Sequence, residues 1–227
     1  MLILKNGKTV RNEIIDLVIN GDIIEDIIIK QGLSGQDYPK EVDAVQDSQE
    51  IDLEGRVGVV DLEGRLVMPG IIDLHTHMRD PGLTHKEDFY TGSRACAKGG
   101  ITTFFDMPNT NPPLTNADSI LERFALAEKS IKQAGLSAFY GIYGGLTSDI
   151  AQIEKMVLFY KKYFPKIVGF KMFAGHSTGN MGIVEKEDQR KVYAALKKFD
   201  YRGILAVHCE KESLMNNSIF DIENPIT

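Results

Sequence analysis

The segment VMPGIIDLHTHMRDPG, residues 67–82, decides how this sequence is interpreted. It begins as an apolar strand and ends with two histidines and a cation. Residues two apart on a strand point to the same side and lie about 7 Å apart, so His75 and His77 can bind one metal ion together. Arg79 continues the same alternation. The segment therefore predicts a metal pair beside a positive charge at the carboxyl end of a strand, where barrel enzymes build their active sites.

The composition is that of a soluble globular protein, with 227 residues, 43% of them hydrophobic and 26% charged. No run reaches the roughly 18 apolar residues of a membrane span, so we expect no membrane association. The net charge of -6, without a basic stripe, argues against a nucleic-acid partner. The start MLILKNGKTV lacks an export signal, and Cys96 and Cys209 are too few for a disulfide scaffold, which predicts a cytoplasmic location. A homo-oligomer is compatible with these features.

We expect a small β-sheet domain at residues 1–65 and a second domain at residues 66–227. In the first, Asn6-Gly7 and Asn20-Gly21 are hairpin signals between short β-rich pieces. These pieces are residues 1–4, 14–19 and 23–29. Residues 31–50 are polar and acidic, with scattered Gly, Pro and Ser, and we expect an exposed loop there.

From Gly70 onward, strands and amphipathic helices alternate at intervals of roughly 30 to 35 residues, which is the length of a βα unit. The expected strands are 71–77, 102–107, 138–143, 168–173 and 204–208. The expected helices are 86–97, 117–134, 149–163 and 186–199, with a fifth beginning at Glu210.

This alternation predicts an α/β fold, a (β/α)8 barrel of the metal-dependent hydrolase kind, of which the chain supplies only about five βα units. A complete barrel takes about 250 residues, so we expect an amino-terminal portion of a longer protein. A doubly wound open sheet is the alternative, but no G-x-G-x-x-G turn follows the first strand of the repeat.

A third histidine, His208, stands at the end of the fifth expected strand, on the face shared with Ile204 and Ala206. By itself such a histidine is more often structural than ligating. Its position matches that of His75 and His77, however, and this favours one shared metal site.

Lys171 is the only charge in the apolar strand IVGFKMF, residues 167–173. An unpaired ammonium inside a barrel costs several kcal/mol, so we expect a lowered pKa and a neutral amine. A neutral amine can capture carbon dioxide as a carbamate, which can bridge two divalent cations. The alternative is a lysine that extends past the strand end into solvent. The neighbouring histidines favour the ligand.

Two bridged cations acidify a shared water and polarise a carbonyl, as the hydrolysis of an unactivated amide requires. Imidazole and carboxylate-like ligands suit zinc, although other first-row metals would fit them too. We therefore expect a metal-dependent hydrolase.

Several motifs together resemble dihydroorotase of the amidohydrolase superfamily, from the small β domain to the last residue. They are His75-Thr76-His77, Arg79-Asp80-Pro81-Gly82, Gly99-Gly100-Ile101-Thr102-Thr103 and Met107-Pro108-Asn109-Thr110. The arginine and the Met-Pro-Asn-Thr motif are specific to dihydroorotase, whereas the whole superfamily shares the two histidines.

The resemblance implies a metal-dependent barrel that interconverts N-carbamoyl-L-aspartate and (S)-dihydroorotate in pyrimidine biosynthesis. It implies two zinc ions, one bound by His75 and His77 and the other by His208, with carbamylated Lys171 as the bridge. The family's fourth metal-binding His and its catalytic Asp, on the sixth and eighth strands, are expected beyond Thr227. This chain is therefore expected to hold no catalytic acid or base and to be inactive alone.

The resemblance also assigns Arg79 and Asn109 to the substrate carboxylate. A guanidinium pairs with a carboxylate through two hydrogen bonds, and an amide adds a third. Alternatively, Arg79 forms a surface ion pair with Asp80 or Glu87, and Asn109 serves a turn. A hydantoinase or allantoinase would use the same metals on a ring without that carboxylate, and a catalytically inactive homologue would act as a scaffold.

Overall fold

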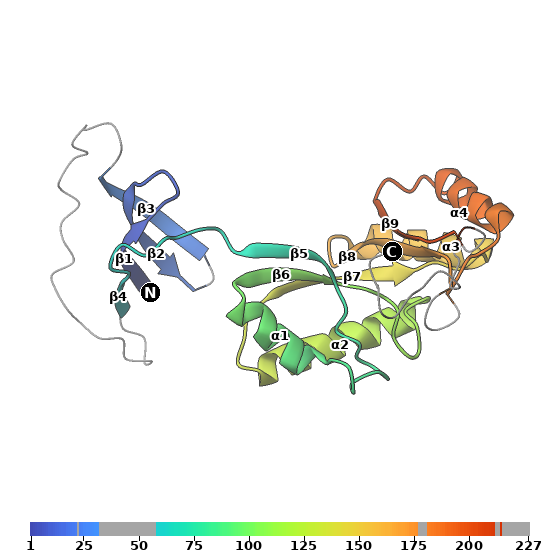
Figure 1. The fold of residues 1–227 in the computed structure, drawn as a ribbon, viewed down its shortest axis with the longest axis horizontal. Helices are drawn as coiled ribbons and strands as arrows, with labels where there is room; N and C mark the ends of the chain where they lie inside the picture. Colours follow the sequence, from blue (N-terminus) through green and yellow to red (C-terminus); the bar gives the residue numbers. More distant parts are fainter. Residues whose placement is uncertain (22, 32–57, 177–180, 212–213, 215–227) are drawn as a thin grey trace, which may run out of the picture. The chain divides into compact units, whose positions relative to one another are not determined.

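The computed structural model describes residues 1–21, 23–31, 58–176, 181–211 and 214. The chain divides into two compact units, Met1–Pro69 and Gly70–Thr227 (Figure 1). The loop expected at residues 31–50 and the helix expected from Glu210 onward fall almost entirely outside the described residues. Within the described part of the chain, no helix is long and apolar enough to cross a membrane.

The first unit contains a four-stranded sheet with the order β3-β2-β1-β4. Its strands are β1 (Leu2–Lys8), β2 (Ile14–Asn20), β3 (Ile23–Gln31) and β4 (Gly58–Asp61). β2 pairs antiparallel with both β1 and β3, whereas β4 pairs parallel with β1. The hairpin expected at Asn20-Gly21 is confirmed, because β2 and β3 are joined there and Gly21 has a φ of 58°.

The hairpin expected at Asn6-Gly7 is wrong. Both residues lie inside β1, where the pairing with β2 shifts register between Leu4 and Gly7. Asn6 has a left-handed φ of 57°, and its N–H donates to Oδ1 of Asp16 at 2.8 Å. An acceptor on the neighbouring strand therefore keeps the chain in the sheet, and the left-handed residue produces a β-bulge instead of a turn.

The second unit contains a curled sheet of parallel strands in the order β5-β6-β7-β8-β9 (Figure 1). The strands are β5 (Ile71–Thr76), β6 (Ile101–Asp106), β7 (Phe139–Gly145), β8 (Ile167–Ala174) and β9 (Ile204–Cys209). The helices between them are α1 (Phe89–Lys98), α2 (Ala117–Gln133), α3 (Ile150–Tyr163) and α4 (Lys186–Lys198). This half-barrel confirms the α/β fold with βα units that the sequence pattern predicts.

Side-chain caps determine where three of these helices begin. Each cap residue accepts a hydrogen bond from an amide of the first turn, which has no partner within its helix. The cap and amide residues are Asp88 with Thr91 at 2.7 Å, Asn116 with Ser119 at 2.9 Å, and Asp149 with Ala151 at 2.9 Å. The first of these helices starts at Phe89, later than expected, because Asp88 is its cap.

Successive strand residues pack into different apolar clusters. Phe104 packs with Phe89 of α1 and Ala127 of α2, on the helix-covered side of the sheet. The next residue, Phe105, packs against a cluster of strand and strand-end residues that includes Tyr143. The largest cluster joins β7 and β8 to α3 and α4. Strand alternation thus separates the contacts with the helices from those on the other side of the sheet.

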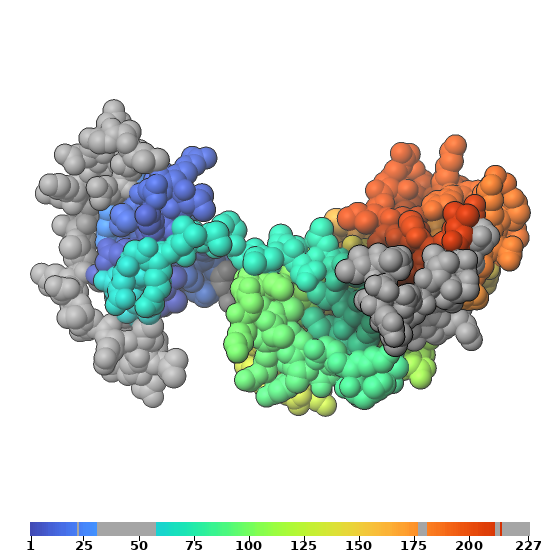
Figure 2. Space-filling model, in the orientation of Figure 1, coloured from blue at the N-terminus to red at the C-terminus, as the bar shows by residue number. Residues whose placement is uncertain are grey.

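β5 and β9 are the edges of the described sheet. On β5, the side chains of Ile71, Ile72 and Leu74 are all exposed, and so is that of Ile204 on β9. Figure 2 shows that the segments of this unit from β5 to α2, coloured teal to green, form one continuous surface. Exposed apolar side chains therefore lie on both edge strands of the described sheet.

Candidate functional site

The expected site residues come from strands of the second unit and from the loops that follow them. His75 lies in β5, Lys171 in β8 and His208 in β9. His77 is not in the strand as expected, because β5 ends at Thr76. The physical reason is that the N–H of Met78 donates to the Asp106 side chain, at 2.7 Å, instead of to a neighbouring strand.

His75 and His77 lie close together, with 5.2 Å between their ring centroids. Burial, followed by the charges of Arg79 and His75, lowers the pKa of His77 to about 4. Burial, followed by the charge of Lys171, also lowers the pKa of His75. Both imidazoles are therefore neutral near pH 7, which is the form that binds a metal ion.

Asn109 holds His77 from the neighbouring loop. Oδ1 of Asn109 lies 2.8 Å from Nδ1 of His77, and Asn109 is buried. The amide nitrogen of Asn109 makes no side-chain hydrogen bond to the described residues. The site thus brings Asn109 and His77 together, and one end of this amide remains able to donate.

Lys171 is only 2% exposed, so it does not extend into solvent. Burial lowers the pKa of its amine. The amine nitrogen lies 5.1 Å from the centroid of the Phe173 ring, and no carboxylate among the described residues pairs with it. The chain therefore holds a buried lysine whose pKa lies below its ordinary value.

His208 has a different partner from the one expected. Its Nε2 lies 2.9 Å from Oε1 of Glu210, and both side chains are about two-fifths exposed. The charge of His208 still contributes to the lowered pKa of His75. In the described ranges, no three His, Cys, Asp or Glu side chains are grouped closely enough to hold a metal ion. The donor chemistry of His75 and His77 fits a metal, whereas Nε2 of His208 is already engaged by Glu210.

Arg79 follows this pair with a left-handed backbone, at a φ of 59°. Such a conformation is uncommon outside glycine, and it often marks a functional loop. Its carbonyl accepts from the N–H of Leu83 at 3.1 Å. Among the described residues, neither Asp80 nor Glu87 forms an ion pair with Arg79, and Glu87 instead accepts from the Asp88 amide at 3.0 Å.

The sequence reasoning missed a buried ion pair between Asp106, at the end of β6, and Arg123 of α2. Both side chains are 0% exposed. Two signals could have revealed it. Asp106 is a charge at the end of the apolar strand ITTFFD, and Arg123 shares a helix face with Ile120 and Ala127.

Comparisons with known proteins identify the family of the chain. The model of the amidohydrolase family matches residues 66–198. The chain belongs to the amidohydrolase family. It is 39% identical to a dihydroorotase of Methanosarcina mazei over 158 residues, which are 69% of this chain and 31% of that protein. A dihydroorotase of Lactobacillus johnsonii is 32% identical over 200 residues, which are 85% of this chain and 43% of that protein.

Hydantoinases are among the solved structures that resemble the chain. The L-hydantoinase from Arthrobacter aurescens has a TM-score of 0.70 and 24% identity, covering 93% of this chain and 41% of the other. A D-hydantoinase from Thermus sp. has a TM-score of 0.61 and 23% identity, and the match covers 94% of this chain and 41% of the other. At these identities the likeness shows the fold alone. The chain spans between 31% and 43% of the two dihydroorotases named above.

Proposed function

We propose that this chain supplies part of the active site of a dihydroorotase, which interconverts N-carbamoyl-L-aspartate and (S)-dihydroorotate in pyrimidine biosynthesis. The observation that carries the proposal is the grouping of two neutral imidazoles, His75 and His77, with the Arg79 loop and Asn109. The sequence identity to dihydroorotases supports the same reaction.

Amidohydrolases are generally metal-dependent, and we propose zinc here, with two ions in a complete active site. His75 and His77 would bind the first ion, Lys171 would bridge as a carbamate, and His208 would bind the second. When bound, the ions would polarise the amide carbonyl and acidify a water molecule. The lowered pKa of Lys171 suits this role, because it is the neutral form of an amine whose nitrogen attacks carbon dioxide and then loses one proton to give the carbamate.

Arg79 and Asn109 would hold the substrate carboxylate. The guanidinium of Arg79 offers two parallel N–H donors, and the free amide nitrogen of Asn109 offers another. The left-handed backbone of Arg79 begins the loop that continues to Leu83. We propose no general acid or base among the residues of this chain. We also propose a cytoplasmic protein that acts on a small molecule.

The test is hydrolysis of dihydroorotate, compared with hydantoin and allantoin, by the protein that carries this chain. Hydantoin and allantoin lack the ring carboxylate. We expect Arg79→Ala to raise KM for dihydroorotate by more than about tenfold, the loss expected for a charged hydrogen-bonding partner. The matched control is Arg94→Ala on the exposed surface of α1. Turnover of hydantoin with an unchanged KM for dihydroorotate in Arg79→Ala would favour a hydantoinase.

Metal content separates an enzyme from a catalytically inactive scaffold. Elemental analysis of the purified protein should give about two zinc ions per complete active site, as a bridged pair requires. A protein without bound metal and without turnover would contradict the proposal and favour a scaffold. The 227-residue chain, assayed alone, should show no turnover of dihydroorotate.

A further inference from the structure

We infer that Asp106 is a positioning residue, held by Arg123, that fixes the backbone of Met78 and thereby orients His77 and Arg79. Neither Asp106 nor Arg123 has a role in the proposed chemistry. The inference rests on the proposed function, because the two residues that it orients are those assigned to the metal and to the substrate carboxylate.

The two oxygens of the Asp106 carboxylate bind different parts of the chain. Oδ2 accepts from Nε of Arg123 at 3.1 Å and also from Nη2. Oδ1 accepts from the backbone N–H of Met78 at 2.7 Å. Met78 is itself 3% exposed, so this amide has no access to water that could replace the carboxylate. A buried amide that loses its acceptor costs about 1–3 kcal/mol.

Met78 is the residue between His77 and Arg79, and this position gives the hydrogen bond its importance. Two residues before Met78, the carbonyl of Thr76 accepts from the N–H of Met107 at 2.9 Å, where β5 and β6 end. Just after it, Arg79 has a φ of 59°, which costs an ordinary residue roughly 1–2 kcal/mol. The Asp106 carboxylate therefore holds the chain where it leaves the sheet and turns to the left-handed conformation.

Arg123 holds the carboxylate without being fully satisfied itself. Its Cζ lies 4.3 Å from the centroid of the Phe89 ring. Its Nη1 is the one buried side-chain nitrogen or oxygen without a hydrogen-bond partner among the described residues. Replacing a buried ion pair by apolar residues is often neutral or stabilising. An incompletely bonded pair is thus a poor source of stability, and orientation of the loop is the better explanation for it.

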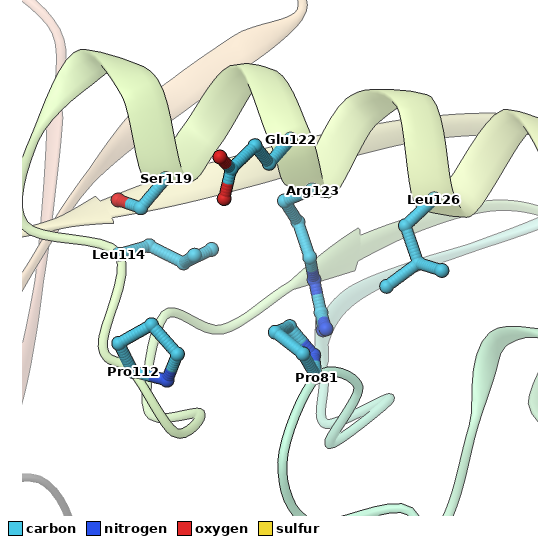
Figure 3. Close-up of a pocket in the computed structure, with 7 residues that line it drawn as sticks. All are labelled: Pro81, Pro112, Leu114, Ser119, Glu122, Arg123 and Leu126. Carbon is cyan, nitrogen blue, oxygen red and sulfur yellow. The ribbon is translucent and has the colours of Figure 1, made fainter.

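Apolar packing holds parts of both loops to α2, since Met78 shares a buried cluster with Ala127 and Leu114 shares one with Ile120. Beside these contacts, a pocket of about 190 Å³ lies between α2 and the loops after β5 and β6. Arg123 extends from α2 toward Pro81 of the loop after β5, and Pro112 of the loop after β6 also lines this pocket (Figure 3). The loops are joined to each other where the N–H of Asn111 donates to the carbonyl of Pro81 at 3.2 Å. Asp106 therefore anchors both loops through Met78.

The test compares two double variants of the full chain. Asp106→Asn with Arg123→Met removes both charges but keeps a carbonyl oxygen for the Met78 amide. Asp106→Leu with Arg123→Met removes that acceptor as well. By calorimetric titration, we expect the zinc dissociation constant of the Leu variant to be about tenfold higher than that of the Asn variant, as for other residues that orient a ligand. Circular dichroism verifies that both variants are folded.

Zinc constants within twofold of each other in the two folded variants would overturn the inference. If the Leu variant does not fold, hydrogen exchange in the unaltered chain decides. The Met78 amide should then exchange as slowly as that of Phe104 in β6, and exchange at the rate of a solvent-exposed amide would overturn the inference. Both measurements are independent of turnover, so a protein without dihydroorotase activity can still pass or fail them.

Where dihydroorotase activity is present, kinetics add a further measurement. The Leu variant should raise KM for dihydroorotate, relative to the Asn variant, more than it lowers kcat, because Arg79 contacts the carboxylate and not the reacting bond. Equal KM values in the two variants would count against the orientation of Arg79.

Discussion

Nδ1 of His77 lies 2.8 Å from Oδ1 of Asn109, and this contact joins the loops that follow β5 and β6. Because the amide oxygen accepts, Nδ1 carries the proton and Nε2 keeps its lone pair. Asn109 thereby selects the tautomer that binds a metal ion through Nε2. Its other end, the amide nitrogen, faces no competing acceptor among the described residues. One side chain can thus orient a metal ligand and donate to a substrate.

The two functions of Asn109 can be separated by substitution. Asn109→Asp keeps an acceptor for His77 but presents a negative charge to the substrate carboxylate. Asn109→Ala removes the acceptor, so we expect its zinc dissociation constant to rise about tenfold, and that of Asn109→Asp to rise less. Both variants should raise KM for dihydroorotate. Calorimetric titration and steady-state kinetics check the two parts, and unaltered zinc binding in Asn109→Ala would refute the first.

The lowered pKa of His77 predicts how the stability of the metal-free chain depends on pH. The native pKa is about 4, against an ordinary value of 6.5. Between these two values the unfolded chain binds more protons, so this histidine's contribution to the free energy of unfolding is lost as the pH falls from 6.5 toward 4. In urea titrations across that pH range, the free energy of unfolding of His77→Gln should therefore fall less steeply with pH than that of the unaltered chain.

Carboxylates titrate in the same range, so the comparison needs a matched control. His85→Gln changes an exposed histidine. This variant keeps His77, so the contribution of His77 to the pH dependence should remain in it. A His77→Gln variant with that same dependence would show that the imidazole is not held in its neutral form.

Lys171→Met should stabilise the metal-free chain. The substitution replaces a buried amine that has no carboxylate partner among the described residues with an apolar side chain of similar length. We expect a gain of about 1 kcal/mol in the free energy of unfolding, because the cost of burying a polar group is removed. Lys86→Met, at an exposed position, should change it by less than about 0.5 kcal/mol. A loss of stability in Lys171→Met would show that the amine has a partner.

Carbamylation of Lys171 can be observed directly. With zinc and 13C-labelled bicarbonate, the protein should give one carbonyl resonance that Lys171→Met lacks and Lys86→Met retains. The label enters because the neutral amine captures carbon dioxide and the two cations stabilise the product. An identical spectrum for all three proteins would leave Lys171 as an uncarbamylated lysine.

Gly82→Ala should destabilise the chain by more than the cost of placing an alanine in a left-handed conformation, because the added Cβ would also collide with a neighbouring loop. Gly82 has a φ of 83°, and an added Cβ would collide with the backbone of Asn111. Gly100 has a similar φ of 78° with open space around it. Gly100→Ala should therefore lower the free energy of unfolding by about 1 kcal/mol, the penalty of a left-handed alanine. Gly82→Ala should lower it by clearly more. Thermal denaturation measures both, and equal costs would mean that the Asn111 loop moves away freely.

Local patterns in the sequence predict the order of strands and helices in the second unit. They fail where a contact from elsewhere in the chain intervenes. Asn6-Gly7 has the residues of a hairpin turn, yet Asp16 holds it within β1 as a bulge. His77 continues the alternation of β5, yet the bond from Met78 to Asp106 ends the strand before it. In both cases a side chain from another strand supplies the hydrogen bond that the local pattern leaves open.

The sequence by itself determined the α/β class and indicated which residues to consider for the candidate site, because strand periodicity and donor chemistry are local properties. It also indicated Lys171 as an amine with a lowered pKa, since a lone charge in an apolar strand has no local partner. Only the tertiary structure decided that Asn109 orients His77 and that Asp106 and Arg123 anchor Met78. These contacts join residues 32, 17 and 28 positions apart, so they form only when the strands and α2 have packed together.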